Sequence, residues 1–137
     1  MLFAGDAIFL VVNEAQVKRS FRLTRSSDFK RVRRYGKSYA HPLVVLYTTS
    51  SIEPNPRIGI SAGRWVGGAV ERNRAKRLLR EVMRSFIPQI PPGNDLLLIA
   101  RSPLPESTFS SVKEALETLL KRAKLITSTY DSNPLPS

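Results

Sequence analysis

The stretch Arg72–Phe86 combines two patterns that a helix lying wholly inside a core would not need together. Its apolar residues recur at helical spacing and form one stripe, which an amphipathic helix packs against a core. The stripe consists of Ala75, Leu78, Leu79, Val82, Met83 and Phe86. The surface between these residues carries Arg72, Asn73, Arg74, Lys76, Arg77, Arg80 and Arg84, with Glu81 as the one acid. Because like charges this close repel one another, the sequence predicts a core helix whose outer face is neutralised by a polyanion.

The charge of the whole chain supports a polyanionic partner. The 137 residues contain 22 Lys and Arg against 11 Asp and Glu, which gives a formal net charge of +11. Residues 18–37 hold nine basic side chains and one acid, and residues 64–84 hold seven basic side chains and two acids. Clustered charge favours a nucleic-acid-binding surface, since phosphate neutralisation releases counterions and supplies most of the affinity. The length fits one domain.

Few residues could carry catalysis. The chain has no cysteine and one histidine, so neither a histidine pair nor a Cys/His nucleophile can form. The histidine, His41, precedes Pro42 at a predicted strand start and is interpreted as an incidental surface or packing residue. The acids are scattered, without the converging carboxylates of a two-metal nuclease, and the glycines do not match a phosphate-binding fingerprint. We expect no catalytic residue and no metal site in the protein itself.

Residues 1–17 are apolar and weakly charged, and we interpret them as an N-terminal extension. The apolar run 7–12 has no basic segment before it, so a docked strand, a sticky extension or an upstream start codon is favoured over a signal peptide. No apolar run approaches the length of a membrane span. Together with the absence of cysteine, this predicts a cytoplasmic protein.

The following residues predict a helix and three strands. The helix should begin at Ser26 or Ser27, either of which offers an N-cap, and end at Gly36. Strands are predicted at 43–48 and 57–62, and the short loop between them favours a hairpin. A third strand at 95–100 is apolar almost throughout, which indicates burial on both faces.

A last helix is marked by the capping-box pattern Ser111-x-x-Glu114 and by an apolar stripe. The stripe consists of Phe109, Val112, Leu116, Leu119, Leu120 and Ala123. Residues 126–137 are interpreted as a flexible tail, which leaves 18–125 as the domain. The order α-β-β-α-β-α predicts an α+β fold, a two-layer sandwich with the helices packed on one small mixed sheet.

A second cationic cluster surrounds the first helix and has aromatic residues among its charges. It consists of Arg22, Arg25, Lys30, Arg31, Arg33, Arg34 and Lys37, with Phe21, Phe29, Tyr35 and Tyr39. Such a mixture suits single-stranded nucleic acid, whose bases stack on aromatic rings while arginines follow the backbone. Phe29 fits a core position equally well, and Tyr47 faces either core or cleft. Trp65, beside Arg64 in a glycine-flanked loop, is interpreted as a loop anchor rather than a stacking residue.

Together these motifs resemble the bacterial ribonuclease P protein component over residues 21–124. The resemblance is carried by Arg22-Leu23, Asp28-Phe29-x-x-Val32, Gly36-Lys37-Ser38, Val45-Leu46-Tyr47, Ile58-Gly59-Ile60-Ser61, Gly67-x-Ala69-Val70-x-Arg72-Asn73-Arg74 and Lys76-Arg77-Leu78-x-Arg80-Glu81. It implies one sheet with packed helices and a left-handed β-α-β crossover that carries the Arg72–Arg74 helix. Right-handed crossovers are the rule, so this handedness comes from the resemblance alone.

The resemblance also implies a function and two groups of site residues. In this family the protein joins a catalytic RNA, which holds Mg²⁺ and performs the hydrolysis that removes the 5′ leader from precursor tRNA. By position, the residues facing the catalytic RNA would be Arg64, Arg72, Asn73, Arg74, Lys76, Arg77 and Arg80. Those lining the cleft for the single-stranded leader would be Arg22, Arg25, Phe29, Arg33 and Tyr47. We expect catalytic RNA and precursor tRNA as partners, no DNA or membrane partner, and no protein oligomer.

Three positions depart from the family pattern. Arg33 stands where a cleft aromatic is frequent, Trp65 replaces a common lysine, and Gly68 replaces a common asparagine, so contacts at these positions are expected to differ. The alternative function is a general RNA-binding or ribosome-associated protein without an enzymatic partner. Such a protein would bind unrelated structured RNAs with similar affinity and would stimulate no catalytic RNA.

Overall fold

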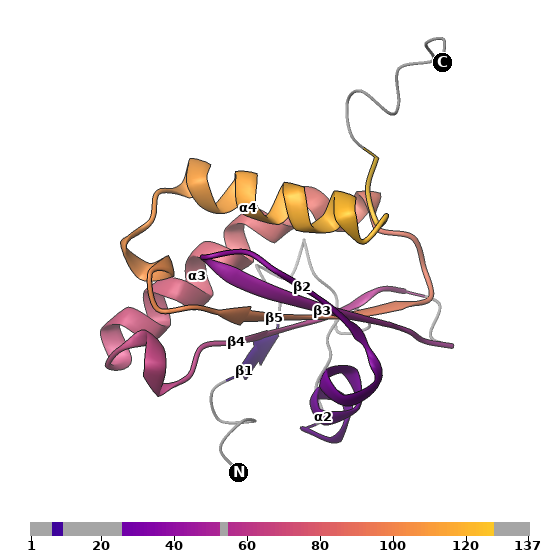
Figure 1. Cartoon of the computed structure of the whole chain (residues 1–137), viewed down its shortest axis with the longest axis horizontal. Coiled ribbons are helices and arrows are strands. Elements are labelled where there is room, and N and C mark those ends of the chain that lie inside the picture. Colours follow the sequence, from indigo (N-terminus) through magenta and orange to yellow (C-terminus); the bar gives the residue numbers. More distant parts are fainter. Residues whose placement is uncertain (1–6, 10–25, 53–54, 128–137) are drawn as a thin grey trace, which may run out of the picture.

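The computed structural model describes residues 7–9, 26–52 and 55–127, which form one five-stranded sheet with helices on both sides (Figure 1). The strands are β1 (Ala7–Phe9), β2 (Lys37–Ala40), β3 (Val44–Ser50), β4 (Arg57–Ser61) and β5 (Asn94–Ala100). The helices are α2 (Ser26–Tyr35), α3 (Ala69–Phe86) and α4 (Phe109–Arg122), and short 3₁₀ helices occur at η2 (Arg64–Val66), η3 (Ile87–Gln89) and η4 (Leu104–Glu106). The predicted α+β class is confirmed.

β5 lies in the middle of the sheet, whose strand order is β1-β4-β5-β3-β2. It pairs in parallel with β4, where Arg57 lies opposite Asp95, and antiparallel with β3 along its whole length. β3 and β4 are therefore not neighbours, and the hairpin predicted from the short loop between them is wrong. The physical reason is the burial of β5, which is apolar almost throughout. In the central position, neighbouring strands cover both of its edges while helices cover both of its faces.

Two outer strands are missing from the predicted α-β-β-α-β-α order. β2 is polar and mostly exposed around Tyr39, so it lacks the apolar alternation that marks a strand, and it pairs antiparallel with β3. β1 pairs antiparallel with β4, with Ile8 opposite Ile60. Residues 7–9 of the N-terminal extension therefore form a docked strand, which was one of the three interpretations of this extension.

The helices cover both faces of the sheet, so the predicted two-layer sandwich is wrong (Figure 1). α3 and α4 pack on one face, in the same core cluster as Leu96 and Leu98 of β5. α2 packs on the other face, in a smaller cluster with Leu97 and Ile99. Successive side chains of a strand point to opposite faces, so a strand that is apolar throughout needs a cover on each. The result is three layers, with the sheet in the middle.

The boundaries of α2 and α3 follow local signals. α2 ends before Gly36, where a Cβ atom would lie 2.5 Å from the carbonyl oxygens of both Val32 and Thr48, so the close backbone approach requires glycine. α3 begins after Gly68, whose backbone N–H donates to Oε1 of Glu71 at 3.0 Å. The apolar stripe predicted for α3 is confirmed, except that Leu78 is only partly buried at the edge of the core.

α4 begins about one turn before Ser111, the first residue of the predicted capping-box pattern. Thr108 is its N-cap, and Oγ1 of Thr108 accepts from the backbone N–H of Ser111 at 3.1 Å. Phe109 is 45% exposed and does not belong to the apolar stripe, whose next four members are buried. Ile126, assigned to the tail from sequence, is buried in the same core. The packed domain therefore extends at least to this residue.

Phe29 is the largest apolar contact between α2 and the sheet. Its ring is 1% exposed and clusters with Val32, Leu97 and Ile99. The ring also lies directly over Gly59 of β4, where a Cβ atom would be only 2.6 Å from Cζ of Phe29. The core alternative for Phe29 is thus confirmed, and this side chain holds α2 against the sheet.

We expect Phe29→Ala to lower the free energy of unfolding by about 3–5 kcal/mol, because it removes a buried ring and leaves a cavity. Urea denaturation followed by circular dichroism would measure the loss. Phe109→Ala is the matched control, since its half-exposed ring should contribute about 1 kcal/mol or less. Similar losses in the two variants would contradict the central role of Phe29.

Candidate nucleic-acid interface

The outer face of α3 carries the first candidate surface, which we call the α3 surface. It consists of Arg64 from η2 and of Arg72, Asn73, Arg74, Lys76, Arg77 and Arg80. Asn73, Arg74 and Arg77 are exposed, and together with Val70 they line an open hollow of about 280 Å³. The amino end of α3 adds the partial positive charge of the helix dipole. The sequence thus predicted a surface that the structure brings together and that suits phosphate groups.

Two residues of the α3 surface are less accessible than the sequence predicts. Lys76 is only 8% exposed and can offer little of its side chain to a partner. Arg80 is half-buried, and this burial, followed by the charge of Arg77, lowers the pKa of its guanidinium group. Nε of Arg80 is buried without a hydrogen-bond partner among the residues that the structure describes. A phosphate beside Arg80 would compensate for its lost hydration.

The second candidate surface, the α2 surface, lies on the opposite side of the sheet and combines cations with rings. It consists of Lys30, Arg33, Arg34, Tyr35 and Tyr47. The guanidinium carbon of Arg33 lies 5.8 Å from the ring centroid of Tyr47, and that of Arg34 lies 5.6 Å from the ring centroid of Tyr35. Rings flanked by cations allow bases to stack while the arginines reach the backbone.

The residues predicted to bind a leader are only partly brought together. Arg33 and Tyr47 are in contact on the α2 surface. Phe29 lies beneath this surface in the core and offers no ring face for stacking. Arg22 and Arg25 lie outside the described residues. A single apolar residue among cations fits a buried or an exposed position equally well, so sequence could not decide where the Phe29 ring lies.

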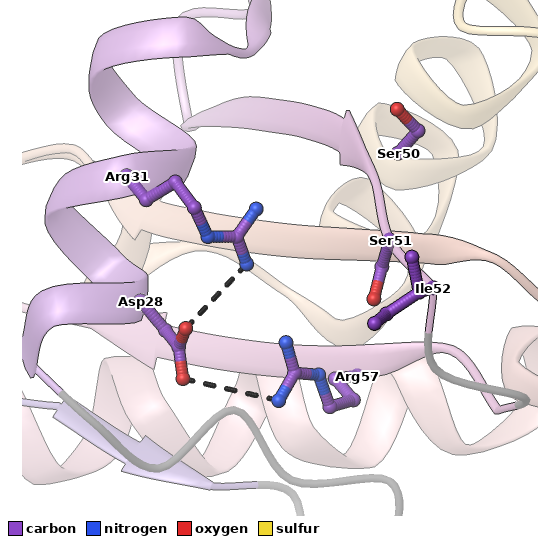
Figure 2. A pocket seen from close by; sticks show the side chains of 6 residues that line it. All are labelled: Asp28, Arg31, Ser50, Ser51, Ile52 and Arg57. Atoms are coloured by element: carbon purple, nitrogen blue, oxygen red, sulfur yellow. Dashed lines mark ion pairs between the residues drawn. The ribbon is translucent and has the colours of Figure 1, made fainter.

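An ion-pair group that sequence analysis missed joins α2 to the sheet. Asp95, at the start of β5, is fully buried and accepts from Nε and Nη2 of Arg57 at 2.9 and 2.8 Å and from Nη2 of Arg31. Asp28 on α2 completes the group, 3.5 Å from Arg31 and 3.8 Å from Arg57 (Figure 2). The pairing could be anticipated only from the parallel register of β4 and β5. Arg31 therefore neutralises a buried acid and is not a free member of the predicted cationic cluster.

The hollow beside this group has about 440 Å³ and mixed charge. Its lining residues are Asp28, Arg31, Ser50, Ser51, Ile52 and Arg57. The two arginines face the two carboxylates of Asp28 and Asp95, so their charges are balanced. This arrangement fixes α2 on the sheet and does not make an anion site comparable to the α3 surface.

The structure also shows the hydrogen bonds of two single residues, Trp65 and His41, whose roles the sequence had suggested. Trp65 of η2 is an anchor, as predicted: its indole Nε1–H donates to the carbonyl oxygen of Ala100 at 2.8 Å. Nδ1 of His41 accepts from the backbone N–H of Leu43 at 3.1 Å, which agrees with a packing role in the turn before β3.

Across the described ranges 7–9, 26–52 and 55–127, no three His, Cys, Asp or Glu side chains gather into a group that could hold a metal ion. In the same part of the chain, none of the helices is long and apolar enough to cross a membrane. Two cationic surfaces on opposite faces of a small α+β domain, one of them with aromatic rings, define a nucleic-acid-binding protein.

Comparison with known proteins identifies the family. Residues 17–124 match the family model described as Ribonuclease P. The ribonuclease P protein component of Exiguobacterium sp. is 41% identical over 109 residues, which cover 80% of this chain and 95% of the relative. That of Clostridioides difficile is 36% identical over 108 residues, covering 78% and 95%.

Solved structures agree with the sequence comparison. The RNase P protein of Staphylococcus aureus matches with a TM-score of 0.71 and 34% identity, covering 78% of this chain and 98% of that one. The RNase P protein of Thermotoga maritima matches with a TM-score of 0.66 and 35% identity, covering 74% and 96%. The chain therefore belongs to the bacterial ribonuclease P protein family. It is the protein subunit of ribonuclease P and assists in processing the 5′ leader of precursor tRNA.

We expect Asp95→Asn to lower the free energy of unfolding by about 3–5 kcal/mol, because it leaves Arg31 and Arg57 partly buried without their shared carboxylate. The loss should persist at high salt, since buried pairs are weakly screened. Glu117→Gln is the control: it removes an acid from the more exposed pair with Lys121 and should cost about 0.5 kcal/mol or less. Urea denaturation of both variants at low and high salt would make the comparison. Equal small losses would contradict the role assigned to Asp95.

Proposed function

We propose that the α3 surface binds the catalytic RNA of ribonuclease P and that the α2 surface binds the 5′ leader of precursor tRNA. The observation that carries this proposal is the placement of the two surfaces on opposite faces of the sheet (Figure 1). A bound catalytic RNA would leave the α2 surface open. The protein can therefore contact both RNAs in one complex.

The chemistry of each surface supports the assignment. The α3 surface is built mainly of guanidinium groups on one helix, which suits the closely spaced phosphates of a folded RNA. The α2 surface adds the rings of Tyr35 and Tyr47, which suit the unpaired bases of a single-stranded leader. Arg33 and Tyr47 carry the proposed leader contact, with Phe29 beneath them as support.

The division of labour between protein and RNA follows from the residues available. With one histidine and no cysteine, the chain cannot form a histidine pair for acid–base cleavage of RNA or a Cys/His nucleophile. We therefore assign the hydrolysis and its Mg²⁺ ions to the catalytic RNA, and binding and charge neutralisation to the protein. The left-handed β4-α3-β5 crossover, the cytoplasmic location and the absence of a protein oligomer stay predictions from the family and the sequence.

For the α3 surface, Arg74→Ala should weaken assembly with a bacterial ribonuclease P RNA. Each lost phosphate contact should reduce the slope of log K against log salt concentration by about one. Fluorescence anisotropy over a series of salt concentrations would measure both effects. Lys121→Ala removes the same charge from α4, where Glu117 already pairs with it at 2.9 Å, and should leave the slope unchanged. Equal slope changes in the two variants would show that Arg74 contributes only net charge.

For the α2 surface, Tyr47→Leu and Arg33→Gln should reduce the preference of the holoenzyme for precursor tRNA over mature tRNA. Tyr47→Leu keeps apolar contact with the core but removes a stacking face worth about 1–3 kcal/mol. Competition binding of the two tRNA forms to the reconstituted holoenzyme would measure the preference. Mature tRNA serves as the internal control, because it has no leader. An equal loss of affinity for both forms would refute the assignment.

A further inference from the structure

The hydrogen bond of Trp65 does not account for the exposure of this residue. Its one polar group is fully used, since Nε1–H donates to the Ala100 carbonyl oxygen at the end of β5. Nevertheless the residue is 55% exposed. An anchor alone explains the hydrogen bond but leaves more than half of a large aromatic side chain in water. The hydrogen bond fixes the orientation of the ring, and the exposure leaves it open to a partner.

The backbone of Gly63 fixes the ring from the other side. A Cβ atom on Gly63 would lie 1.9 Å from Cζ3 and 2.3 Å from Cη2 of the indole, so the ring occupies the space that any other residue would fill. The φ of Gly63 is −90° and its ψ is −171°, an extended conformation that any residue adopts. The glycine is therefore needed for the indole and not for the backbone. The exposed ring is held in one place before any partner arrives.

Arginines lie close to Trp65 along the chain and next to its hydrogen-bond acceptor. Arg64 precedes it in η2 and is exposed, and Arg101 follows Ala100 and is also exposed. α3 begins four residues after Trp65 and carries Arg72 in its first turns. A rigid aromatic face among arginines is the arrangement that takes a stacked base with its phosphates.

We propose that Trp65 is a preformed stacking platform for an unpaired base of the catalytic RNA. The proposal rests on the assignment of the α3 surface to that RNA, and it extends this surface to the ring of Trp65 at the end of β5. Catalytic RNA is favoured over the leader because Trp65 is contiguous with the α3 surface, whereas the leader residues lie with α2 across the sheet.

The chain has one tryptophan, so its fluorescence reports directly on this site. Titration of the full-length protein with a bacterial ribonuclease P RNA should quench the fluorescence. Inorganic polyphosphate, which has charge but no bases, should bind without comparable quenching. A leader oligonucleotide of unpaired bases should also leave it largely unquenched. Equal quenching by polyphosphate, or quenching by the leader in place of the catalytic RNA, would overturn the proposal.

Affinity measurements on variants give the second test. Trp65→Ala should weaken binding of the catalytic RNA by about 5- to 150-fold with an unchanged salt slope, and Trp65→Phe should retain most of the affinity. Arg64→Ala, by contrast, should change the slope. Wild-type affinity in Trp65→Ala would overturn the stacking proposal; if Arg74→Ala also bound like wild type, the α3 surface itself would be misassigned.

Gly63→Ala supplies a matched control because it displaces the indole without removing it. It should weaken RNA binding in the wild-type protein but have no further effect in the Trp65→Ala background. Equal effects in both backgrounds would show that the ring position does not matter and would overturn the proposal. Urea denaturation of each variant would separate loss of the contact from loss of the fold.

Discussion

The burial of β5 on both faces is the constraint on which the rest of the structure depends. Its alternate side chains support α3 and α4 on one face and α2 on the other. Asp95 at its start fixes α2 through Arg31, and the carbonyl oxygen of Ala100 at its end fixes Trp65. One strand thereby sets the position of the α2 surface and the α3 surface relative to each other. A change in its register would move them together.

The three-layer arrangement also solves an electrostatic problem. The whole chain has a formal net charge of +11, and clustered cations repel one another unless a polyanion neutralises them. The sheet and its two cores lie between the α2 surface and the α3 surface, so the two groups of cations do not adjoin each other. Two partly buried arginines, Arg31 and Arg57, pair with the buried Asp95. The exposed cations of the α3 surface have no such buried acid beside them in the described ion pairs.

Sequence patterns predicted the helices and strands better than they predicted which strands pair with one another. The stripe of α3, the limits of α2 and the two-sided burial of β5 could be read because apolar spacing is a local signal. The position of β5 between β3 and β4 could not be predicted in this way. Loop length is a local signal, whereas strand pairing is decided by burial across the whole sheet. The clustering of basic residues along the chain predicted the two cationic surfaces. The contact of Arg57 with Asp95 could not be predicted, because it depends on a parallel register that no local pattern encodes.

The separation of β3 from β4 by a strand that comes much later in the chain has a consequence for folding. A chain synthesised only as far as Gly93 contains both strands but lacks the one that belongs between them. Their short connection brings two unpaired edges together, and such edges pair readily. A β3–β4 hairpin formed at that stage must open again before β5 can enter. The native sheet is therefore completed only after α3 has crossed over it, late in synthesis and through contacts of long sequence separation, which slow folding.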